Sequence, residues 1–582
     1  MGAFRDDLQQ PQSHLTHLQS LALSRRALLR QGSLAAGAIG LAGLLAACGN
    51  ASKSPSSSGS TGSGNAAATS GTTNATETAG KPVQGGTFTY ALNQEPESLD
   101  PEVTTYAVTN KININVFDPL VWQAPDLSFV PGLAEKWDVS PDATAFTFHL
   151  RTDVKFHDGN KLDADAVKFS WDRIMNPDTK SKTALNQMGP FKQATVVDPA
   201  TIKAEFSESF APFLDAASQS YCAPVSPAAV QKFGDQFAYN LVGTGPYKLK
   251  EWVKGDHVTL VKNPDYNWAP TIFKHQGPGY LDQIVFKIVI ENATRTGLLQ
   301  SAQVDGIDSV PAKDVATFKA DSSKYEIMLA EAPGIPTLLV LNTKKFPTDD
   351  IAVRKALQYG TDKDAVIKVL DFGLYTAAYG PLTSVTLGYD DSLKTMYPYD
   401  PKKATQTLED AGWKKGSDGF YAKDGKQLAL DYYASNTDTT PPLLQAQWKS
   451  IGINTNIKAM DYNAVIPLVT KGDANLASIG WIQADPDVCR IILYSKNIGT
   501  GYGWSFFTND ELDQTIIKAA SSVDPAVRKP LYAKIQQITM ENALVLPITN
   551  LFAIYGLQSY VKNFRVDTRG WYPWLYDVFL QK

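Results

Sequence analysis

The stretch TLLVLNTKKFPTDDIAVRKALQYGTDKDAVIKVL, residues 337–370, carries the pattern that decides the class of fold. It opens with an apolar run of strand length and continues as two predicted helices interrupted at Gly360. Further strands are predicted at 428–433 and 453–459, with helices between them. Strands that alternate with helices are typical of α/β domains, so we predict an α/β fold.

The first half of the chain gives similar signals. Residues 87–93 and 145–151 alternate between apolar and polar side chains, as strands with one buried face do. A helix is predicted over 164–174, because Asp163 is a suitable N-cap and apolar residues recur on one helical face. Residues 283–290 read as a strongly buried strand.

Length and charge limit the possible functions. A chain of 582 residues is several times the usual domain size, so two or three packed units are expected. The 54 Lys and Arg nearly balance the 59 Asp and Glu, and no block of one sign suggests a surface for nucleic acid.

The N-terminal segment SRRALLRQGSLAAGAIGLAGLLAACGN, residues 24–50, resembles an export signal. The uncharged run from Ser33 to Ala47 is shorter than the roughly 20 apolar residues that span a bilayer. Arg25 and Arg26 resemble the twin-arginine export motif, with Leu28 where phenylalanine is more usual, and a basic region before a short apolar run is typical of a signal peptide. We predict that residues 1–47 are a signal peptide that is removed.

The residues around Cys48 resemble a bacterial lipobox, in which the cysteine thiol is acylated and becomes the new N-terminus. The following residues, 49–80, are rich in Ser, Gly and Thr and poor in large apolar side chains. As a flexible coil this segment would have a root-mean-square end-to-end distance on the order of 30 Å. We therefore predict a lipid-anchored linker over 48–82, which holds a folded body near a membrane.

Reactive-site motifs are not found. The three cysteines give no CxxC pair, and the sequence leaves open whether Cys222 and Cys489 pair or stay free. The chain has no HExxH, no GxSxG and no GxxxxGK[ST] sequence, so an enzyme is not indicated, a glycosidase included. We predict no cofactor and no metal, since residues 336–549 contain no histidine; His157 is interpreted as structural.

Six separated groups of motifs resemble the solute-binding proteins of ABC importers, specifically the peptide/nickel-binding class known as family 5. They occur in the expected order from about residue 85 onward: GLAEKWDVS, AFTFHLR and VKFHDG within 132–159, DADAVKFSWDRI at 163–174, GTGPYKLKEW and LVKNPDYNW within 243–268, LNTKKFPTDDIAVRKALQYGTDKDAV at 341–366, AGWKKGSDGFYAKDGK at 411–426, and KSIGINTNIKAMDYN at 449–463.

This resemblance implies a bilobal periplasmic-binding-protein-like fold of class II, cluster C type, with an extra domain inserted in lobe one. Strands that pass back and forth between two cores form a hinge, and the cleft between the lobes becomes the ligand site. The implied boundaries are 83–105, 222–335 and 550–582 for lobe one, 106–221 for the inserted domain and 336–549 for lobe two.

The resemblance also implies a carboxylate for the ligand's ammonium group. In peptide-binding members this carboxylate follows a Gly-Trp pair, and here GWIQADPD places Asp485 and Asp487 after Trp481. The segment is shorter than in the family pattern, so which aspartate faces the cleft stays open. Asp485 is preferred, and the alternative for either is a turn or cap carboxylate beside Pro486.

Other candidates come from aromatic and loop positions. Their alternatives are ordinary core packing and loop or turn chemistry. The candidate ligand-binding residues are Trp481, Tyr502 and Trp504 beside the Gly-Trp motif, Asn93 and Glu95 in the loop after the first strand, and Tyr247 near an expected interlobe crossing.

The expected function is capture of a solute in the open cleft, hinge closure around it, and delivery to membrane permease subunits. An oligopeptide or dipeptide is the preferred ligand, because backbone amides and a terminal charge can be bound without reading side chains. An oligosaccharide or another small solute is the alternative, and a nickel complex is less favoured. We expect a monomer on the outer face of the bacterial cytoplasmic membrane, with no nucleic-acid partner.

Overall fold

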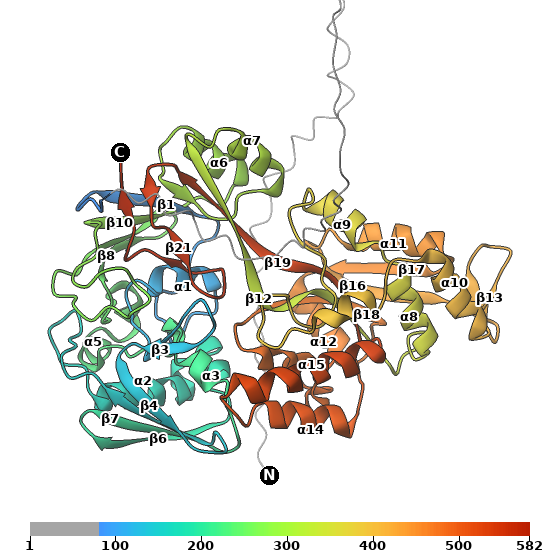
Figure 1. Cartoon of the computed structure of the whole chain (residues 1–582), viewed down its shortest axis with the longest axis horizontal. Coiled ribbons are helices and arrows are strands. Elements are labelled where there is room, and N and C mark those ends of the chain that lie inside the picture. Colours follow the sequence, from blue (N-terminus) through green and yellow to red (C-terminus); the bar gives the residue numbers. More distant parts are fainter. Residues whose placement is uncertain (1–80) are drawn as a thin grey trace, which may run out of the picture. The chain divides into compact units, whose positions relative to one another are not determined.

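A ten-stranded mixed sheet runs through the computed structural model, which describes residues 81–582 (Figure 1). Its strand order is β17 (Asn454–Met460), β16 (Ala429–Ser435), β18 (Leu476–Ile482), β12 (Tyr325–Leu341), β19 (Val545–Gln558), β11 (Gly306–Ile307), β1 (Thr87–Leu92), β10 (Gln283–Ile288), β9 (His257–Lys262) and β8 (Tyr247–Val253). The alternation of strands and helices predicted for the second half is confirmed, and the fold is α/β and bilobal.

The two long strands β12 and β19 belong to both lobes (Figure 1). Their first paired part, from Tyr325 opposite Gln558 to Ala332 opposite Leu551, lies beside β11 of lobe one. After a register shift the two strands pair again from Thr337, and β18 of lobe two pairs with β12 from Gly334 onward. The chain therefore crosses between the lobes as hydrogen-bonded strands and not as loose linkers.

Gly334 lies at the register shift in β12. Its φ of +122° is in the region that favours glycine, and an added Cβ would lie 2.1 Å from the carbonyl oxygen of Trp481. Both its backbone groups are bonded to lobe two, since its N–H donates to Thr386 Oγ1 at 2.8 Å and its carbonyl accepts from the N–H of Thr383 at 2.8 Å. A side chain here would separate β12 from β18.

Lobe one is built around β1 and the strands paired with it. Phe88, Tyr90 and Phe286 form its aromatic core with Tyr555 of β19. Helix α1 (Ala107–Asn113) falls in the range 106–221 predicted for the inserted domain, but its Val108 and Ile112 pack in this core. The lobe also contains α5 (Pro227–Phe233), α6 (Asn292–Gln300), α7 (Val315–Ala320) and the C-terminal strands β20 (Val561–Lys562), β21 (Arg565–Val566), β22 (Pro573–Trp574) and β23 (Phe579–Leu580). Lobe one thus needs the first and the last described segments of the chain.

A separate four-stranded antiparallel sheet lies within residues 134–206, in the order β4 (Ala134–Val139), β5 (Ala145–Leu150), β7 (Thr201–Phe206) and β6 (Phe191–Asp198). Helix α2 (Ala164–Met175) packs on it through Trp171, and α3 (Thr183–Met188) and α4 (Phe213–Ala216) follow. The predicted N-cap is confirmed, since Asp163 accepts a bond from the N–H of Ala166 at 2.9 Å. This sheet has its own core within the predicted inserted domain, whose boundaries stay a prediction.

Lobe two places helices around its part of the large sheet. The two helices expected around Gly360 are confirmed as α8 and α9. The helices and the small sheet of this lobe are α8 (Ile351–Tyr359), α9 (Lys363–Leu370), α10 (Pro401–Asp410), α11 (Pro441–Ser450), α12 (Tyr462–Thr470), α13 (Arg490–Leu493), α14 (Asp510–Ala519), α15 (Pro525–Glu541), β13 (Lys414–Lys415), β14 (Tyr421–Lys423) and β15 (Lys426–Gln427).

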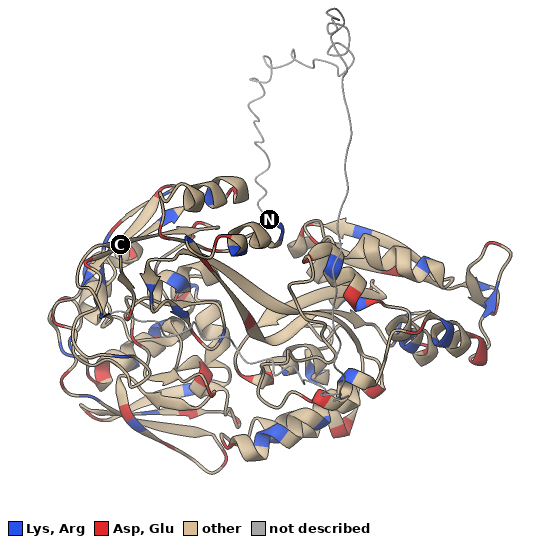
Figure 2. Cartoon of the chain, turned by 45° about the horizontal axis from the view of Figure 1, so that its top comes forward, with Lys and Arg blue, Asp and Glu red and all other residues tan. Residues whose placement is uncertain are grey.

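Positive and negative side chains are mixed over the surface of residues 81–582. Lys and Arg lie among Asp and Glu in both lobes, without a large block of one sign (Figure 2).

Cys222 and Cys489 are both free and buried, which answers the question of their pairing, and burial raises the pKa of both thiols. None of the helices in the described residues is long and apolar enough to cross a bilayer.

His157 joins the small sheet region to the loop before β8. Its Nδ1 accepts from the N–H of Gly243 at 3.3 Å, and its Nε2 lies 2.9 Å from the carbonyl oxygen of Gly245, so the neutral tautomer with a proton on Nε2 fits both partners. Burial lowers the pKa of His157 from 6.5 to about 4. Its interpretation as a structural residue agrees with these contacts.

Replacement of His157 by Gln should change how stability depends on pH. The unfolded chain takes up the histidine proton below about pH 6.5, whereas the folded protein resists it down to about pH 4, so acid removes stability that the neutral ring supplies. The wild type should lose on the order of 2 kcal/mol from this residue between pH 7 and pH 5. Urea unfolding should therefore show the stability gap between wild type and His157→Gln narrowing by that amount, and a constant gap would contradict the assignment.

Candidate functional site

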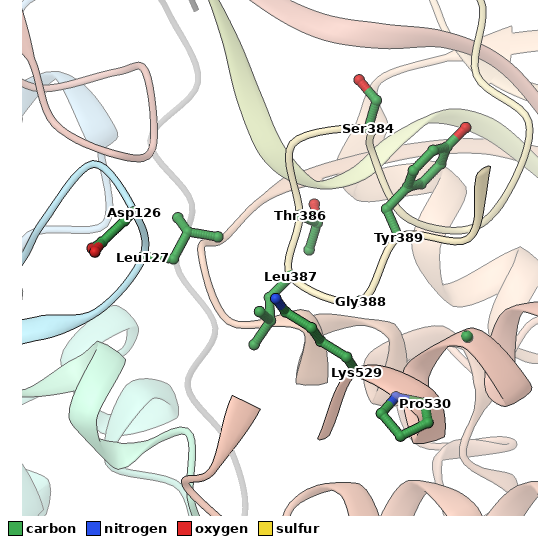
Figure 3. Close-up of a pocket in the computed structure, with 10 residues that line it drawn as sticks. Asp126, Leu127, Ser384, Thr386, Leu387, Gly388, Tyr389, Lys529 and Pro530 are labelled. Carbon is green, nitrogen blue, oxygen red and sulfur yellow. The ribbon is translucent and has the colours of Figure 1, made fainter. Parts of the chain in front are cut away.

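A cavity of about 530 Å³ lies between segments from different parts of the chain (Figure 3). One wall is the turn between β2 (Val121–Gln123) and β3 (Phe129–Pro131), and the other is formed by lobe two. The lining residues are Asp126 and Leu127 from the turn, Ser384, Thr386, Leu387, Gly388 and Tyr389 from the loop after α9, and Lys529, Pro530 and Ala533 from α15. This volume suits a small ligand or part of a peptide.

Opposite charges line the two walls of this cavity. The Asp126 carboxylate accepts from the N–H of Ser128 at 3.0 Å and from its hydroxyl at 2.6 Å, and these bonds lower its pKa. Lys529 lies across the gap in Figure 3, where it extends toward Leu387. Within residues 81–582, neither Asp126 nor Lys529 has an oppositely charged partner within 4.0 Å. Both charges are therefore available to a ligand.

The lobe-two wall is fixed to the crossing strand β12. Ser384 donates its hydroxyl hydrogen bond to Glu331 of β12, and burial raises the pKa of Glu331. Gly388 packs against α15, since an added Cβ would lie 2.9 Å from the Cβ of Tyr532. The loop that lines the cavity is thus bonded to the crossing strand on one side and packed against α15 on the other.

Asp485 does not present a free carboxylate. It is the N-cap of a 3₁₀ turn, η6 (Pro486–Cys489), and accepts from the N–H of Asp487 at 2.8 Å. Both of its oxygens also bind the guanidinium of Arg528 at 2.7 Å, and the two side chains are 5% and 6% exposed. The cap alternative is thus what the structure shows, and direct binding of a ligand by Asp485 remains only a prediction.

Asp487 is engaged in the same way. Its carboxylate accepts from Arg490 Nε at 2.7 Å and from the hydroxyl of Tyr532 at 3.1 Å. Burial raises its pKa, and the Arg490 guanidinium opposes that rise. A ligand ammonium would have to displace an arginine to reach either aspartate, and which of the two faces the cleft stays a prediction.

The three aromatic candidates form one cluster in lobe two. The ring of Trp481 lies 5.7 Å from that of Tyr502, and Tyr502 lies 5.1 Å from Trp504. Trp504 is buried and donates its indole N–H to Thr470 at 3.2 Å, so it is a core residue. Trp481 and Tyr502 are half-buried and keep exposed surface, as residues that line a cleft would.

The candidates of lobe one are held by local bonds. Asn93 donates to Ser309 Oγ at 3.0 Å, and Glu95 accepts from the N–H of Gly255 at 2.7 Å. Tyr247 is fully buried in the core of lobe one against Gly279, so the structure gives it a packing role in place of a position on the cleft. Ligand contacts of Asn93 and Glu95 remain predictions.

Sequence reasoning missed the residues that line the cavity. None of the eight predicted ligand residues is among them, and Asp126, Tyr389 and Lys529 come from three segments without any motif. These three residues lie around one cavity only because the fold brings segments that are distant in the sequence next to each other. The predicted lipidation site Cys48 and the export residues Arg25 and Arg26 lie outside the described residues. No group of three His, Cys, Asp or Glu side chains in residues 81–582 is arranged to hold a metal ion.

Comparison with known proteins agrees with this architecture. The profile of the bacterial extracellular solute-binding proteins, family 5 (middle region), matches residues 128–499. The chain is 29% identical over 519 residues to the dipeptide-binding protein of Escherichia coli K12, covering 84% of this chain and 94% of that protein. It is 29% identical over 468 residues to the glutathione-binding protein GsiB of Salmonella choleraesuis, covering 79% and 88%.

A solved structure extends the similarity to three dimensions. The periplasmic binding protein DppA of Helicobacter pylori, in complex with the peptide STSA, is 26% identical and superposes with a TM-score of 0.68. The match covers 86% of this chain and 99% of that one. With crossing strands, two lobes, a cavity between segments of different lobes, and a family profile that matches more than half of its length, the chain belongs to the bacterial extracellular solute-binding proteins of family 5.

Proposed function

We propose that this protein captures peptides in the cleft between its lobes and delivers them to the permease subunits of an ABC transporter. The observation that carries the proposal is the cavity with one uncompensated charge of each sign on opposite walls. A peptide with free termini carries the complementary pair of charges. The similarity to a dipeptide-binding protein and to a peptide complex supports the same ligand class.

In this proposal Lys529 binds the ligand's carboxylate, and Asp126 is the carboxylate nearest to its ammonium group. Trp481 and Tyr502 do not line this cavity but retain exposed aromatic surface, and in this proposal they contact apolar parts of a ligand that extends beyond it. Closure is favoured only to the extent that the ligand binds the closed form better than the open one. Charges on the two walls supply that preference, because one ligand can contact both only when they are close.

The proposal also includes a lipid anchor on Cys48. The lipobox and the polar linker support it, together with membership of an extracellular family. In that arrangement the folded body works outside the cytoplasm while it remains close to its permease.

Ligand identity can be tested directly on the purified protein. Native mass spectrometry should detect co-purified peptide, and alanine peptides of two to five residues should raise the melting temperature by a few degrees at about 100 times Kd, where binding adds about 2.7 kcal/mol. The peptides should be recovered intact. Stabilisation by maltotriose and not by peptides would favour the oligosaccharide alternative, and hydrolysis products would contradict a binding function.

The Lys529→Ala variant should bind a free-acid peptide about fivefold more weakly, as expected for one partly solvated ion pair. The same variant should bind the C-terminally amidated peptide as well as the wild type does, because that ligand has no carboxylate to lose. Lys534→Ala, on the same helix and paired with Glu511, is the matched control. Isothermal titration calorimetry measures the affinities of the three proteins for both peptides, and equal losses for acid and amide in Lys529→Ala would reject the contact.

The Cys48→Ser variant should be released from the membrane. The thiol is the atom that would carry the lipid, so the wild type should sediment with membranes and incorporate an alkyne-labelled fatty acid, whereas Cys48→Ser should do neither. Cys222→Ser, which retains Cys48 and removes a buried thiol, is the control and should behave like the wild type. Labelling of Cys48→Ser would contradict the anchor.

A further inference from the structure

The segment that follows helix α9 binds the crossing strand β19 at the register shift. Asn550 of β19 lies between Leu551 and Thr549, which pair with β12 on either side of the shift. The N–H of Asn550 donates to the carbonyl oxygen of Thr376 at 2.9 Å, and its side-chain amide donates to Thr376 Oγ1 at 2.8 Å. The segment after α9 thus holds β19 at the point where the pairing with β12 changes register.

This contact has the geometry of a short antiparallel strand pair. Ala377 and Thr549 form an antiparallel bridge, and the N–H of Ala378 donates to the carbonyl oxygen of Ile548 at 3.2 Å. Thr549 also pairs with Thr337 of β12, so the new segment lies on the other edge of β19, where β11 pairs further along. At this point β19 therefore has a partner on both edges.

The same segment also reaches lobe one. The ring of Tyr375 stacks on Phe552, on the lobe-one side of the shift, with 4.9 Å between the ring centroids and 17° between the planes. Leu374 and Tyr375 pack against the apolar cluster of lobe one that includes Phe318 of α7. Residues 374–378 therefore contact β19 on both sides of the register shift, and we call them the hinge strap.

A buried lysine of α9 fixes one end of the hinge strap. Lys363 Nζ donates to the carbonyl oxygen of Ala378 at 2.8 Å and lies 5.0 Å from the ring centroid of Tyr379. Lys363 is 9% exposed, and burial lowers its pKa from 10.5 to about 7. The amine can donate this bond in its charged and in its neutral form. Burial of an amine is costly unless it is hydrogen-bonded, so Lys363 and Ala378 hold each other in place.

We propose that the hinge strap restrains separation of the lobes and that Lys363 is the residue that positions it. Lys363 ties the strap to lobe two, Tyr375 contacts lobe one, and the bonds to β19 lie between these two contacts. Opening at the register shift has to move Tyr375 relative to Phe552 or separate the strap from β19. The effect of the strap on ligand retention rests on the proposed function, whereas the restraint itself does not.

The test compares Lys363→Met with Lys368→Met in the full-length, ligand-free protein. Methionine keeps an unbranched apolar side chain but cannot donate to Ala378, and Lys368 is an exposed residue of the same helix that serves as the matched control. Hydrogen–deuterium exchange should show the amides of Ala378 and Asn550 exchanging about tenfold faster in Lys363→Met, as expected for loss of one hydrogen bond. Lys368→Met should exchange as the wild type does.

Other amides distinguish local loosening from a general loss of stability. Those of β1 and β10 in lobe one and of β16 and β17 in lobe two should keep wild-type protection in both variants. Unchanged exchange of Ala378 and Asn550, or equally faster exchange in all of these strands, would overturn the proposal. Should Lys363→Met fail to fold, Tyr375→Ala removes the ring contact with Phe552 and should increase exchange of Asn550 in the same way.

A disulfide should replace the missing lysine. Ala377 and Thr549 are a non-hydrogen-bonded antiparallel pair, because the bonds are made by the residues on either side of them. Cα atoms of such pairs lie about 4.5 Å apart, which fits a disulfide. Ala377→Cys and Thr549→Cys, added to Lys363→Met, should restore protection of Asn550 when oxidised and lose it again on reduction. Fast exchange of Asn550 with the disulfide intact would show that Lys363 does not act through the strap.

A further measurement links the hinge strap to ligand retention. With trialanine as the probe, stopped-flow tryptophan fluorescence should show dissociation from Lys363→Met about tenfold faster, with association nearly unchanged. Equal dissociation rates would overturn the role in retention. Absence of trialanine binding by the wild type would contradict the proposed ligand alone, because exchange in the ligand-free protein still decides whether the strap restrains the lobes.

Discussion

Two antiparallel strands, β12 and β19, belong to both lobes. The strand order of the large sheet and the connection between the lobes both depend on this pair. The backbone N–H and C=O groups of both strands need hydrogen-bond partners along the whole strand length. Lobe one supplies β11, which pairs with β19, and lobe two supplies β18, which pairs with β12. The register shift between Ala332 and Thr337 contains Gly334, the residue at which β18 begins to pair with β12. The shift divides the paired length of β12 and β19 into a lobe-one part and a lobe-two part, while both strands continue through it.

This location explains why the cavity wall and the crossing strands are connected. Glu331 and Gly334 lie at or beside the shift, and both bind the loop from Thr383 to Thr386. Ser384 and Thr386 line the cavity and also bind the crossing strand, so the cavity wall and the crossing strands are in direct contact.

Much of the fold was accessible from sequence, and the site was not. The helices on either side of Gly360 and the cap at Asp163 were predictable, since both depend on residues near each other in the chain. Asp485 was predicted to contact the ligand, but the structure binds it to Arg528, which lies 43 residues further along the chain, and nothing in the sequence joins the two. Buried charges find partners through tertiary packing, and an isolated aspartate in a sequence therefore cannot show whether it is available to a ligand.

The first and the last described segments both belong to lobe one, and this has a consequence for biosynthesis. Strand β1 lies beside β10 and β11, but β19 and the segment around Arg569 complete the same lobe from the far end of the described residues. Synthesis has to pass β19 and Arg569 before lobe one has all its strands, whereas the strands within residues 134–206 pair only with one another. Lobe one is therefore completed late, after the strands of the four-stranded sheet have all been synthesised.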